Sequence, residues 1–282
     1  MISAPSSSAH DPAKLALADG TVVRGRALGH RGLTGGELCF NTSMTGYQEI
    51  TTDPSYRGQL MMMTQPHIGN YGASAEAMEA RKPMIAGLIV RDSPRCHSNP
   101  QADESLEDFM RRHSLVGISG VDTRALVRHV RDRGVMNAVI SSDPLDDETL
   151  VQKAKDWPSM AGLELASEVT VAEPYTFCEG PGPRIAVYDF GVKQNILRSF
   201  RRRGCTVKVM PQDTALGEVL AWEPDGLFFS NGPGDPRPME AAIDRVGNAI
   251  DTGLPIFGIC LGHQLMALAQ GFEVYKMHVG HR

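Results

Sequence analysis

The sequence is poor in cysteine. Only 5 of its 282 residues are cysteines, and they are widely spaced, with no CxxC pair. An odd number of scattered cysteines argues against a disulfide framework and against a zinc site. We therefore expect a reducing, cytoplasmic setting in which most of these thiols, including Cys39 in a strand-like segment, are packing residues.

Long apolar runs and an excess of basic residues are also missing. No apolar run approaches the roughly 20 residues that span a bilayer, so no membrane partner is expected. The formal net charge is -5, whereas nucleic-acid-binding surfaces are usually basic, so no nucleic-acid partner is expected either. Residues 1–13 lack the basic and apolar regions of a secretory signal and are predicted to be a disordered tail.

Several sequence motifs that bind nucleotides or metals are absent. The chain has no Walker A, HExxH, EF-hand or GxGxxG pattern. The basic run 201–204 is interpreted as a solvated helix end rather than a phosphate site. We expect no metal and no cofactor in this chain.

Strand and helix patterns alternate through the second half of the chain. Four apolar runs, each followed by a helical pattern, read RIAVYDFG, TVKVMP, GLFFSNGPGDP and LPIFGIC. Such alternation predicts an α/β fold with a doubly wound parallel sheet. Ligands bind beyond the carboxyl ends of such strands, which directs attention to the loops SNGPGDP and CLGHQ.

The first half predicts a different, mixed α/β domain. Asp19-Gly20 joins two alternating segments as a hairpin, and Asp122 or Thr123 is a candidate helix cap. The strand order does not follow from the pattern. A segment rich in proline and glycine, 171–183, is the predicted linker between an N-terminal domain at 14–170 and a second domain at 184–282.

The segment GICLG has the form of a nucleophile elbow with cysteine in place of serine. Cys260 stands where the last strand ends and the last helix begins, and a helix N-terminus lowers the pKa of a thiol. The N–H of Leu261 would face a developing oxyanion, and Gly232 or Gly234 would supply the second donor. Gln264, four residues after Cys260, lies on the same helix face.

Taken together, FGICLGHQL and SNGPGDP resemble the triad (class I) glutamine amidotransferases. Further segments resemble the small, glutamine-hydrolysing subunit of carbamoyl-phosphate synthase: FNTSMTGYQEITTDPSYRGQ, PHIGNYG, GLIVRD, VDTRALVR and YDFGVKQNILR. The resemblance runs from about Leu15 to the last residue. It implies an N-terminal small-subunit domain followed by part of an amidotransferase domain.

The resemblance also implies roles for individual residues. Cys260 would attack the side-chain amide of L-glutamine and form a thioester, with Leu261 and Gly232 as the oxyanion hole. The residues expected to contact glutamine are Ser55, Gly232, Gly234, Leu261 and Gln264. Ammonia would pass through a tunnel to a large partner subunit, which would use ATP, Mg²⁺ and bicarbonate to make carbamoyl phosphate for arginine and pyrimidine biosynthesis.

The sequence departs from the family pattern after the elbow. The family's base and its orienting carboxylate come from a His-Pro-Glu motif, and no His-x-Glu triplet follows Cys260 here. His263, His278 and His281 are poor candidates for the base. We therefore expect a C-terminally truncated member whose partial sheet leaves an apolar surface exposed.

Two alternatives to this function remain. One is an amidotransferase that serves another synthase, such as those making anthranilate, aminodeoxychorismate or GMP, although those proteins begin near the equivalent of Arg184. The other is a partner-binding or regulatory subunit without hydrolytic activity, which the absent triad residues favour.

Overall fold

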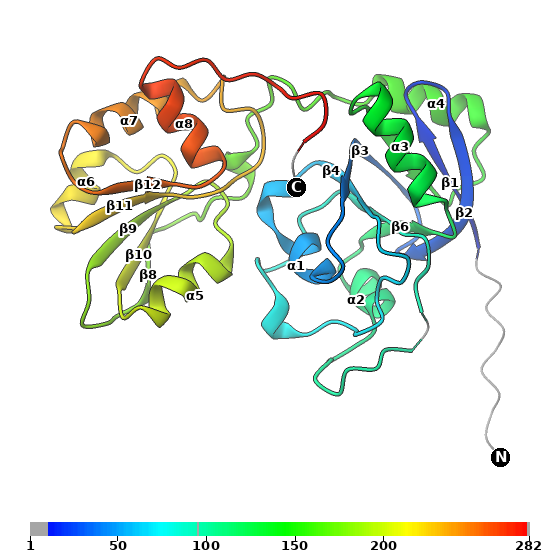
Figure 1. The fold of residues 1–282 in the computed structure, drawn as a ribbon, viewed down its shortest axis with the longest axis horizontal. Coiled ribbons are helices and arrows are strands. Elements are labelled where there is room, and N and C mark those ends of the chain that lie inside the picture. Colours follow the sequence, from blue (N-terminus) through cyan, green and yellow to red (C-terminus); the bar gives the residue numbers. More distant parts are fainter. Residues whose placement is uncertain (1–10, 95, 281–282) are drawn as a thin grey trace.

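The computed structural model describes residues 11–94 and 96–280. Within these residues the strands form two separate sheets, a closed barrel followed by an open sheet (Figure 1). Ten residues of the predicted 1–13 tail lie outside the described part of the chain. The first strand begins at Pro12, so the end of that predicted tail is ordered.

The N-terminal half is built around the seven-stranded barrel. Its strands, in spatial order, are β1 (Pro12–Leu17), β2 (Val22–Gly29), β6 (Val116–Ser119), β5 (Gly87–Ile89), β4 (Gln59–Met63), β3 (Leu33–Asn41) and β7 (Asn137–Ser141). The predicted hairpin at Asp19-Gly20 is confirmed, because β1 and β2 pair antiparallel across it. Residues of these strands enter three buried clusters, which they share with different helices of the N-terminal half.

Helices and short 3-10 turns cover the barrel. They are α1 (Tyr47–Thr52), α2 (Leu106–Arg112), α3 (Thr123–Arg133), α4 (Asp147–Asp156), η1 (Pro54–Tyr56) and η2 (Ala75–Ala77). A further turn, η3 (Ala166–Glu168), packs its Ala166 into the core of the second half. The Asp122 carboxylate accepts the N–H of Ala125 and caps α3, which confirms the first of the two predicted cap residues. Ser105 and Asp146 cap α2 and α4 in the same way.

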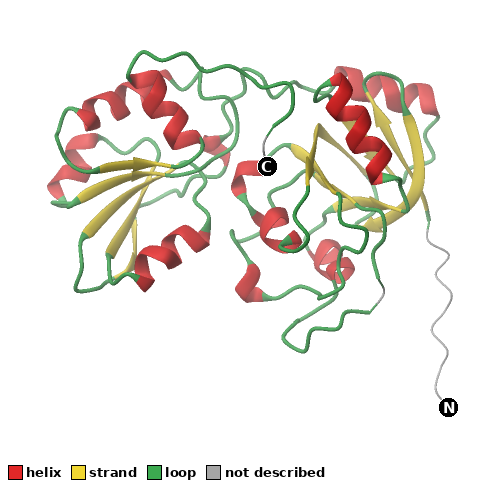
Figure 2. Ribbon diagram, in the orientation of Figure 1, coloured by secondary structure: helices red, strands yellow, loops and turns green. Residues whose placement is uncertain are grey.

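The second half is a three-layer α/β structure (Figure 2). Its sheet has the order β12 (Ile256–Gly258), β11 (Gly226–Phe229), β9 (Arg184–Asp189), β10 (Thr206–Pro211) and β8 (Tyr175–Cys178). One face is covered by α6 (Leu216–Ala221), α7 (Glu240–Ile250) and α8 (Leu261–Ala269), and the other by α5 (Gln194–Arg202). The predicted doubly wound sheet is therefore confirmed, with its four predicted strands all parallel.

A fifth strand was not predicted. β8 lies within the predicted linker 171–183 and pairs antiparallel with β10 at the edge of the sheet. The prolines and glycines that suggested a linker flank this strand. One of them, Gly182, joins the segment to the second half, because its N–H donates to the carbonyl of Gly204. The segment is thus part of the second sheet.

The order of the strands creates a switch point between β9 and β11. The chain leaves β9 in one direction toward β10 and later returns to the other side of β9 as β11. The loops after these two strands therefore separate at one end of the sheet and leave a crevice.

Strand β12 forms the edge of the sheet that lies farthest from β8. Its Phe257 is 64% exposed, which agrees with the expected apolar surface.

Candidate active site

Cys260 sits in a strained backbone conformation between β12 and α8. Its φ of 51° and ψ of -110° are rare for any residue but glycine, and it occupies the N-cap position of α8. The residue is exposed, and its carbonyl accepts the N–H of Gln264, which closes the first turn of the helix. The chain therefore presents the Cys260 thiol at the positive end of a helix.

The two glycines of the elbow are required by close backbone contacts. A Cβ on Gly262 would lie 2.2 Å from the carbonyl oxygen of Phe229, and a Cβ on Gly258 would lie 2.8 Å from the backbone nitrogen of His263. The N–H of Gly262 donates to the carbonyl of Ser230, which joins α8 to the loop after β11. Strand, turn and helix could not pack this closely with larger residues.

The glycine loop after β11 lies against the elbow. A Cβ on Gly232 would lie 2.2 Å from the carbonyl oxygen of Phe190 and 2.8 Å from the Leu261 side chain. Gly234 has a φ of +93° and packs against the backbone of Leu163 in the N-terminal half. The loop after β11 thus touches α8 through Leu261 and the N-terminal half through Leu163.

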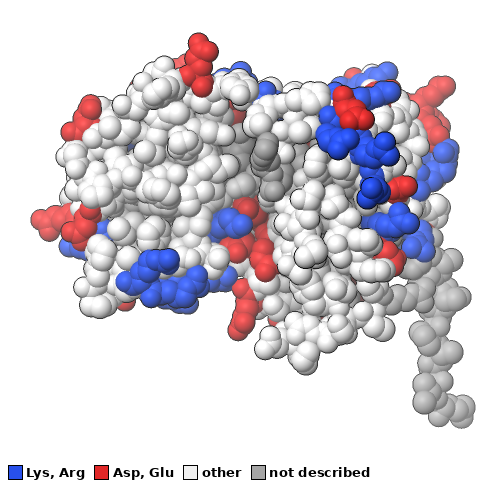
Figure 3. Space-filling view, viewed as in Figure 1, with Lys and Arg blue, Asp and Glu red and all other residues white. Residues whose placement is uncertain are grey.

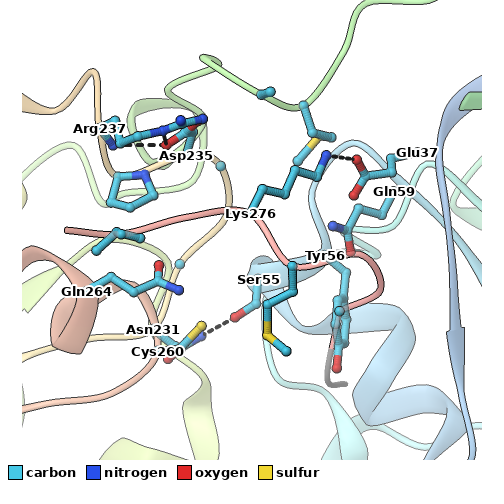
Figure 4. Close-up of a pocket in the computed structure, with 18 of the residues that line it drawn as sticks. Glu37, Ser55, Tyr56, Gln59, Asn231, Asp235, Arg237, Cys260, Gln264 and Lys276 are labelled. Atoms are coloured by element: carbon cyan, nitrogen blue, oxygen red, sulfur yellow. Dashed lines mark hydrogen bonds and ion pairs between the residues drawn. The ribbon is translucent and has the colours of Figure 1, made fainter. Parts of the chain in front are cut away.

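A cavity of about 570 Å³ lies where the two halves of the chain meet. Five of the six predicted site residues line it: Cys260, Gln264, Gly232, Gly234 and Ser55. The sixth, Leu261, has a buried side chain and lies directly after Cys260. Figure 4 shows the Cys260 and Gln264 side chains from one side of this cavity and Ser55 from the other.

Asn231 connects the two sides of the cavity. Its side-chain amide donates to the Ser55 hydroxyl at 2.9 Å and to the Gly191 carbonyl at 2.8 Å, while its side-chain oxygen accepts the N–H of Lys193. The residue is only 2% exposed. Asn231 therefore fixes the loop after β11 to Ser55, although it was not among the predicted site residues.

Charged groups hold the same junction. The Lys193 ammonium lies 3.2 Å from the buried carboxylate of Asp53. Burial alone would lower the pKa of Lys193, but the negative charges of Asp53 and Glu79 outweigh burial and the pKa is raised. Lys193 is therefore a cation at neutral pH.

The N-terminal half also supplies a cap for a helix of the second half. The Glu79 carboxylate accepts the N–H of Asn195 at 2.8 Å in the first turn of α5. Burial raises the pKa of Glu79, and the Asn195 hydrogen bond and the positive charge of Lys193 limit that rise. A carboxylate at a helix N-terminus is stabilised by the unpaired N–H groups there.

A third connection involves Asp235 at the end of the glycine loop. Its carboxylate accepts the N–H of Gly162 at 2.9 Å and pairs with Arg237. The hydrogen bonds from Arg237 lower the pKa of Asp235 to about 2. This loop is therefore fastened to the N-terminal half on both sides of its glycines.

None of the described residues that line the cavity is a histidine. His263 is exposed on α8, and the His278 ring contacts the carbonyl of Arg131 on α3. His281 lies outside the described residues.

Two further predictions concern residues away from the cavity. Cys39 is buried in β3, as predicted. The side chains of Arg201, Arg202 and Arg203 are exposed at the C-terminal end of α5, where Figure 3 shows basic side chains. Among the described residues, no group of three or more His, Cys, Asp or Glu is placed to hold a metal ion. The helices of the described part of the chain are also too short or too polar to span a bilayer.

Asn231 and Lys193 are not the only polar lining residues that were missed, and three others matter below. They are Glu37 of β3, Gln59 of β4 and Lys276, which follows α8. Glu37 lies in no family-like segment, and Gln59 is only the last residue of FNTSMTGYQEITTDPSYRGQ. The pairing of β3 with β4 brings the two residues together. Asn231 could have been identified from the sequence, because it directly precedes Gly232, the glycine predicted to bind the oxyanion.

Comparison with known proteins agrees with this arrangement. Residues 15–140 match the family described as carbamoyl-phosphate synthase small chain, CPSase domain, and residues 186–282 match glutamine amidotransferase class-I. The carbamoyl phosphate synthase small chain of Syntrophotalea carbinolica is 49% identical over 95% of this chain and 75% of its own length. Those of a Synechococcus strain and of Pectobacterium atrosepticum are 48% and 46% identical and are covered over 72% and 75% of their lengths. The chain therefore belongs to the carbamoyl-phosphate synthase small chain family and carries a class I glutamine amidotransferase domain.

Proposed function

We propose that Cys260 hydrolyses glutamine through a covalent thioester. The observation that carries this proposal is the strained, exposed position of Cys260 at the N-terminus of α8, facing a cavity that Ser55 and Gln264 also line. A helix N-terminus stabilises a thiolate, and the thiolate is the reactive nucleophile. A buried packing cysteine would need neither the strain nor the cavity.

In the proposed reaction, the Cys260 sulfur attacks the side-chain carbonyl carbon of glutamine. The carbonyl oxygen becomes an oxyanion, and the backbone N–H groups of Leu261 and Gly232 donate to it. The carbon–nitrogen bond then breaks, and ammonia leaves after gaining a proton. Water attacks the resulting thioester, releases glutamate and restores the thiol.

Binding of glutamine is assigned to the residues around the thiol. We propose that Ser55, Gly232, Gly234, Leu261 and Gln264 contact the substrate. Support comes from the cavity, which four of these five residues line, and from Asn231, which holds Ser55 against the loop after β11. Because Ser55 and Gln264 come from different halves of the chain, glutamine would bind at their junction.

The proton transfers need a base, and we place that base outside the described residues. A cysteine nucleophile of this kind normally uses a histidine oriented by a carboxylate. The described cavity lining has no histidine, and the 282 residues have no His-x-Glu after Cys260. We therefore expect thioester formation and turnover by this 282-residue chain to be slow.

We further propose that the released ammonia passes to a large partner subunit. That subunit would use ATP, Mg²⁺ and bicarbonate to make carbamoyl phosphate, so that ATP and Mg²⁺ are cofactors of the partner and not of this chain. Support for this part comes from family membership, since the relatives are small chains of carbamoyl phosphate synthase. The carbamoyl phosphate formed would feed arginine and pyrimidine biosynthesis.

Active-site labelling tests the nucleophile. The 282-residue chain is incubated with 6-diazo-5-oxo-L-norleucine, an electrophilic glutamine analogue, and the modified residue is located by mass spectrometry. We expect one adduct, on Cys260, that excess L-glutamine suppresses. Cys96→Ser, which changes another exposed cysteine, serves as the matched control and should label normally.

Turnover is tested, with the large subunit added, in a version of the chain extended by the family's His-Pro-Glu segment. Cys260→Ser should abolish glutamine-dependent synthesis of carbamoyl phosphate and leave ammonia-dependent synthesis unchanged. Labelling of another cysteine, or loss of both activities, would show that Cys260 is structural. Rapid glutamine hydrolysis by the 282-residue chain alone would contradict the placement of the base.

A further inference from the structure

Two buried polar side chains stand side by side in the wall of the cavity. Glu37 of β3 and Gln59 of β4 are direct partners in the register of these parallel strands. Each is only 5% exposed, and each lines the cavity that Cys260 also lines. Partners in adjacent strands point to the same face of a sheet, so both side chains present oxygen atoms to one region.

The Glu37 carboxylate already holds one ammonium group. One of its oxygens pairs with the side-chain nitrogen of Lys276, and the other lies 3.8 Å from the Cys39 sulfur. Lys276 comes from the segment after α8, which crosses to the barrel, where the carbonyl of His278 accepts the N–H of Val135. A carboxylate this buried needs a positive partner, and the structure shows a primary ammonium in that role.

Gln59 has an acceptor that is not used. Its side-chain oxygen is buried and makes no hydrogen bond within the described part of the chain. An acceptor left unsatisfied in this way destabilises the fold, and buried polar atoms in native proteins rarely lack a partner. Figure 4 shows the Gln59 amide beside Glu37 and directed toward the space next to Lys276.

We propose that Glu37 and Gln59 form a binding subsite for a small ammonium cation. The carboxylate supplies the charge and the amide oxygen supplies a second acceptor. An ammonium ion has four N–H donors and satisfies both oxygens at once, whereas Lys276 pairs only with Glu37. The side chain of Lys276 occupies part of the subsite and competes with the free cation.

This inference rests on the proposed function for the origin of the ligand. Hydrolysis of glutamine releases ammonia into this cavity, and ammonia is largely protonated in neutral water. The same chemistry belongs to the α-ammonium group of L-glutamine itself. The subsite therefore recognises an ammonium group, and the two sources are separated by experiment.

The first experiment titrates the 282-residue chain with ammonium chloride at neutral pH. Binding is followed by NMR through the side-chain amide signal of Gln59, with potassium chloride at equal concentration as the control for ionic strength and ion size. We expect saturable shifts with ammonium and not with potassium. Glu37→Gln, followed in this way, and Gln59→Met, followed through backbone signals of β3 and β4, should each weaken ammonium binding at least tenfold.

Substitution of Lys276 tests the subsite while Glu37 stays in place, so a folding defect of Glu37→Gln cannot decide the result. Lys276→Met removes the competing ammonium group and should strengthen ammonium binding several-fold. Lys153→Met, an exposed lysine on α4, is the matched control and should leave binding unchanged. If Glu37 and Lys276 formed only a structural ion pair, no variant would alter the response to ammonium.

The second experiment separates the two sources of the ammonium group. L-Glutamine and glutaramate, which lacks the α-amino group, are titrated into the native chain and into Glu37→Gln. If Glu37→Gln weakens the binding of L-glutamine but not of glutaramate, the subsite is assigned to the α-ammonium group of the substrate. If Glu37→Gln binds both compounds normally and loses ammonium binding, the subsite is assigned to the released ion. Equal responses to ammonium and potassium, together with unchanged L-glutamine binding, would overturn the proposal, even if Cys260 still forms its glutamine-analogue adduct.

Discussion

The side-chain amide of Asn231 donates to the hydroxyl of Ser55 at 2.9 Å, although the two residues are 176 positions apart in the chain. Asn231 belongs to the loop that carries the predicted oxyanion donor, and Ser55 lies in the short turn η1, which Asp53 caps. The bond therefore sets the distance between two sides of the candidate active site. Its loss should affect both the stability of the chain and the shape of the cavity.

Asn231→Ala should destabilise the chain by about 2–4 kcal/mol, because it leaves the buried carbonyl of Gly191 and the N–H of Lys193 without their partner. Ser55→Ala removes only one acceptor and should cost about 1 kcal/mol. Urea denaturation of both variants measures the two free energies of unfolding. Equal costs would mean that Asn231 does not hold the junction.

Cys260→Gly should raise the free energy of unfolding by about 1 kcal/mol, because glycine adopts the φ of 51° without strain. Cys260→Ala keeps a Cβ and thus the strain, so its stability should stay within about 0.5 kcal/mol of the native chain. Thermal unfolding of the three chains makes the comparison. A destabilised glycine variant would show that the Cys260 side chain contributes packing.

Gly262→Ala should destabilise the chain by about 3 kcal/mol, because the new Cβ would lie 2.2 Å from the carbonyl oxygen of Phe229. The matched control is Gly217→Ala in α6, where no atom lies within 4 Å of an added Cβ. Alanine at Gly217 should stabilise the helix by about 0.5–1 kcal/mol. Changes of the same sign in both variants would contradict the close contact at Gly262.

Asp235 should make stability depend on pH in the acidic range. Its pKa in the folded chain is about 2, below the usual 3.8, so the carboxylate stabilises the fold above pH 4. This contribution, about 2 kcal/mol from the size of the shift, is lost as pH falls from about 4 through 2. Asp235→Asn should be less stable than the native chain at pH 7, with a difference that shrinks toward pH 2 in urea titrations. A constant difference would place the pKa near its ordinary value.

The sequence predicted most elements with a local signal. The hairpin at Asp19-Gly20, the cap at Asp122 and the four parallel strands of the second half all depend on residues close in the chain. β8 was missed because its flanking prolines and glycines are equally typical of a linker, and because the partner that orders it, β10, lies some distance along the chain. Local patterns do not reveal which distant strand an edge segment will join.

The site was predictable in part for the same reason. The elbow at Cys260 is a local motif, whereas Ser55 was identified from the family resemblance, and the structure places both in one cavity. Glu37 lies in no family-like segment and Gln59 only at the end of one, and their juxtaposition depends on the register of β3 and β4. Lys193 becomes recognisable as a site residue only when the two halves of the chain are packed together, because its partner Asp53 lies in the first half.

The closed barrel has a consequence for the order of events during synthesis. Closure requires β1 to pair with β7, so that Lys14 meets Ser141 across more than a hundred intervening residues. A pairing between such distant segments forms slowly, since a long loop must close before the contact is gained. On the ribosome, β1 can pair with β2 early, but its other edge stays open until residue 141 has emerged. A chaperone that shields this edge in that interval would raise the yield of folded protein.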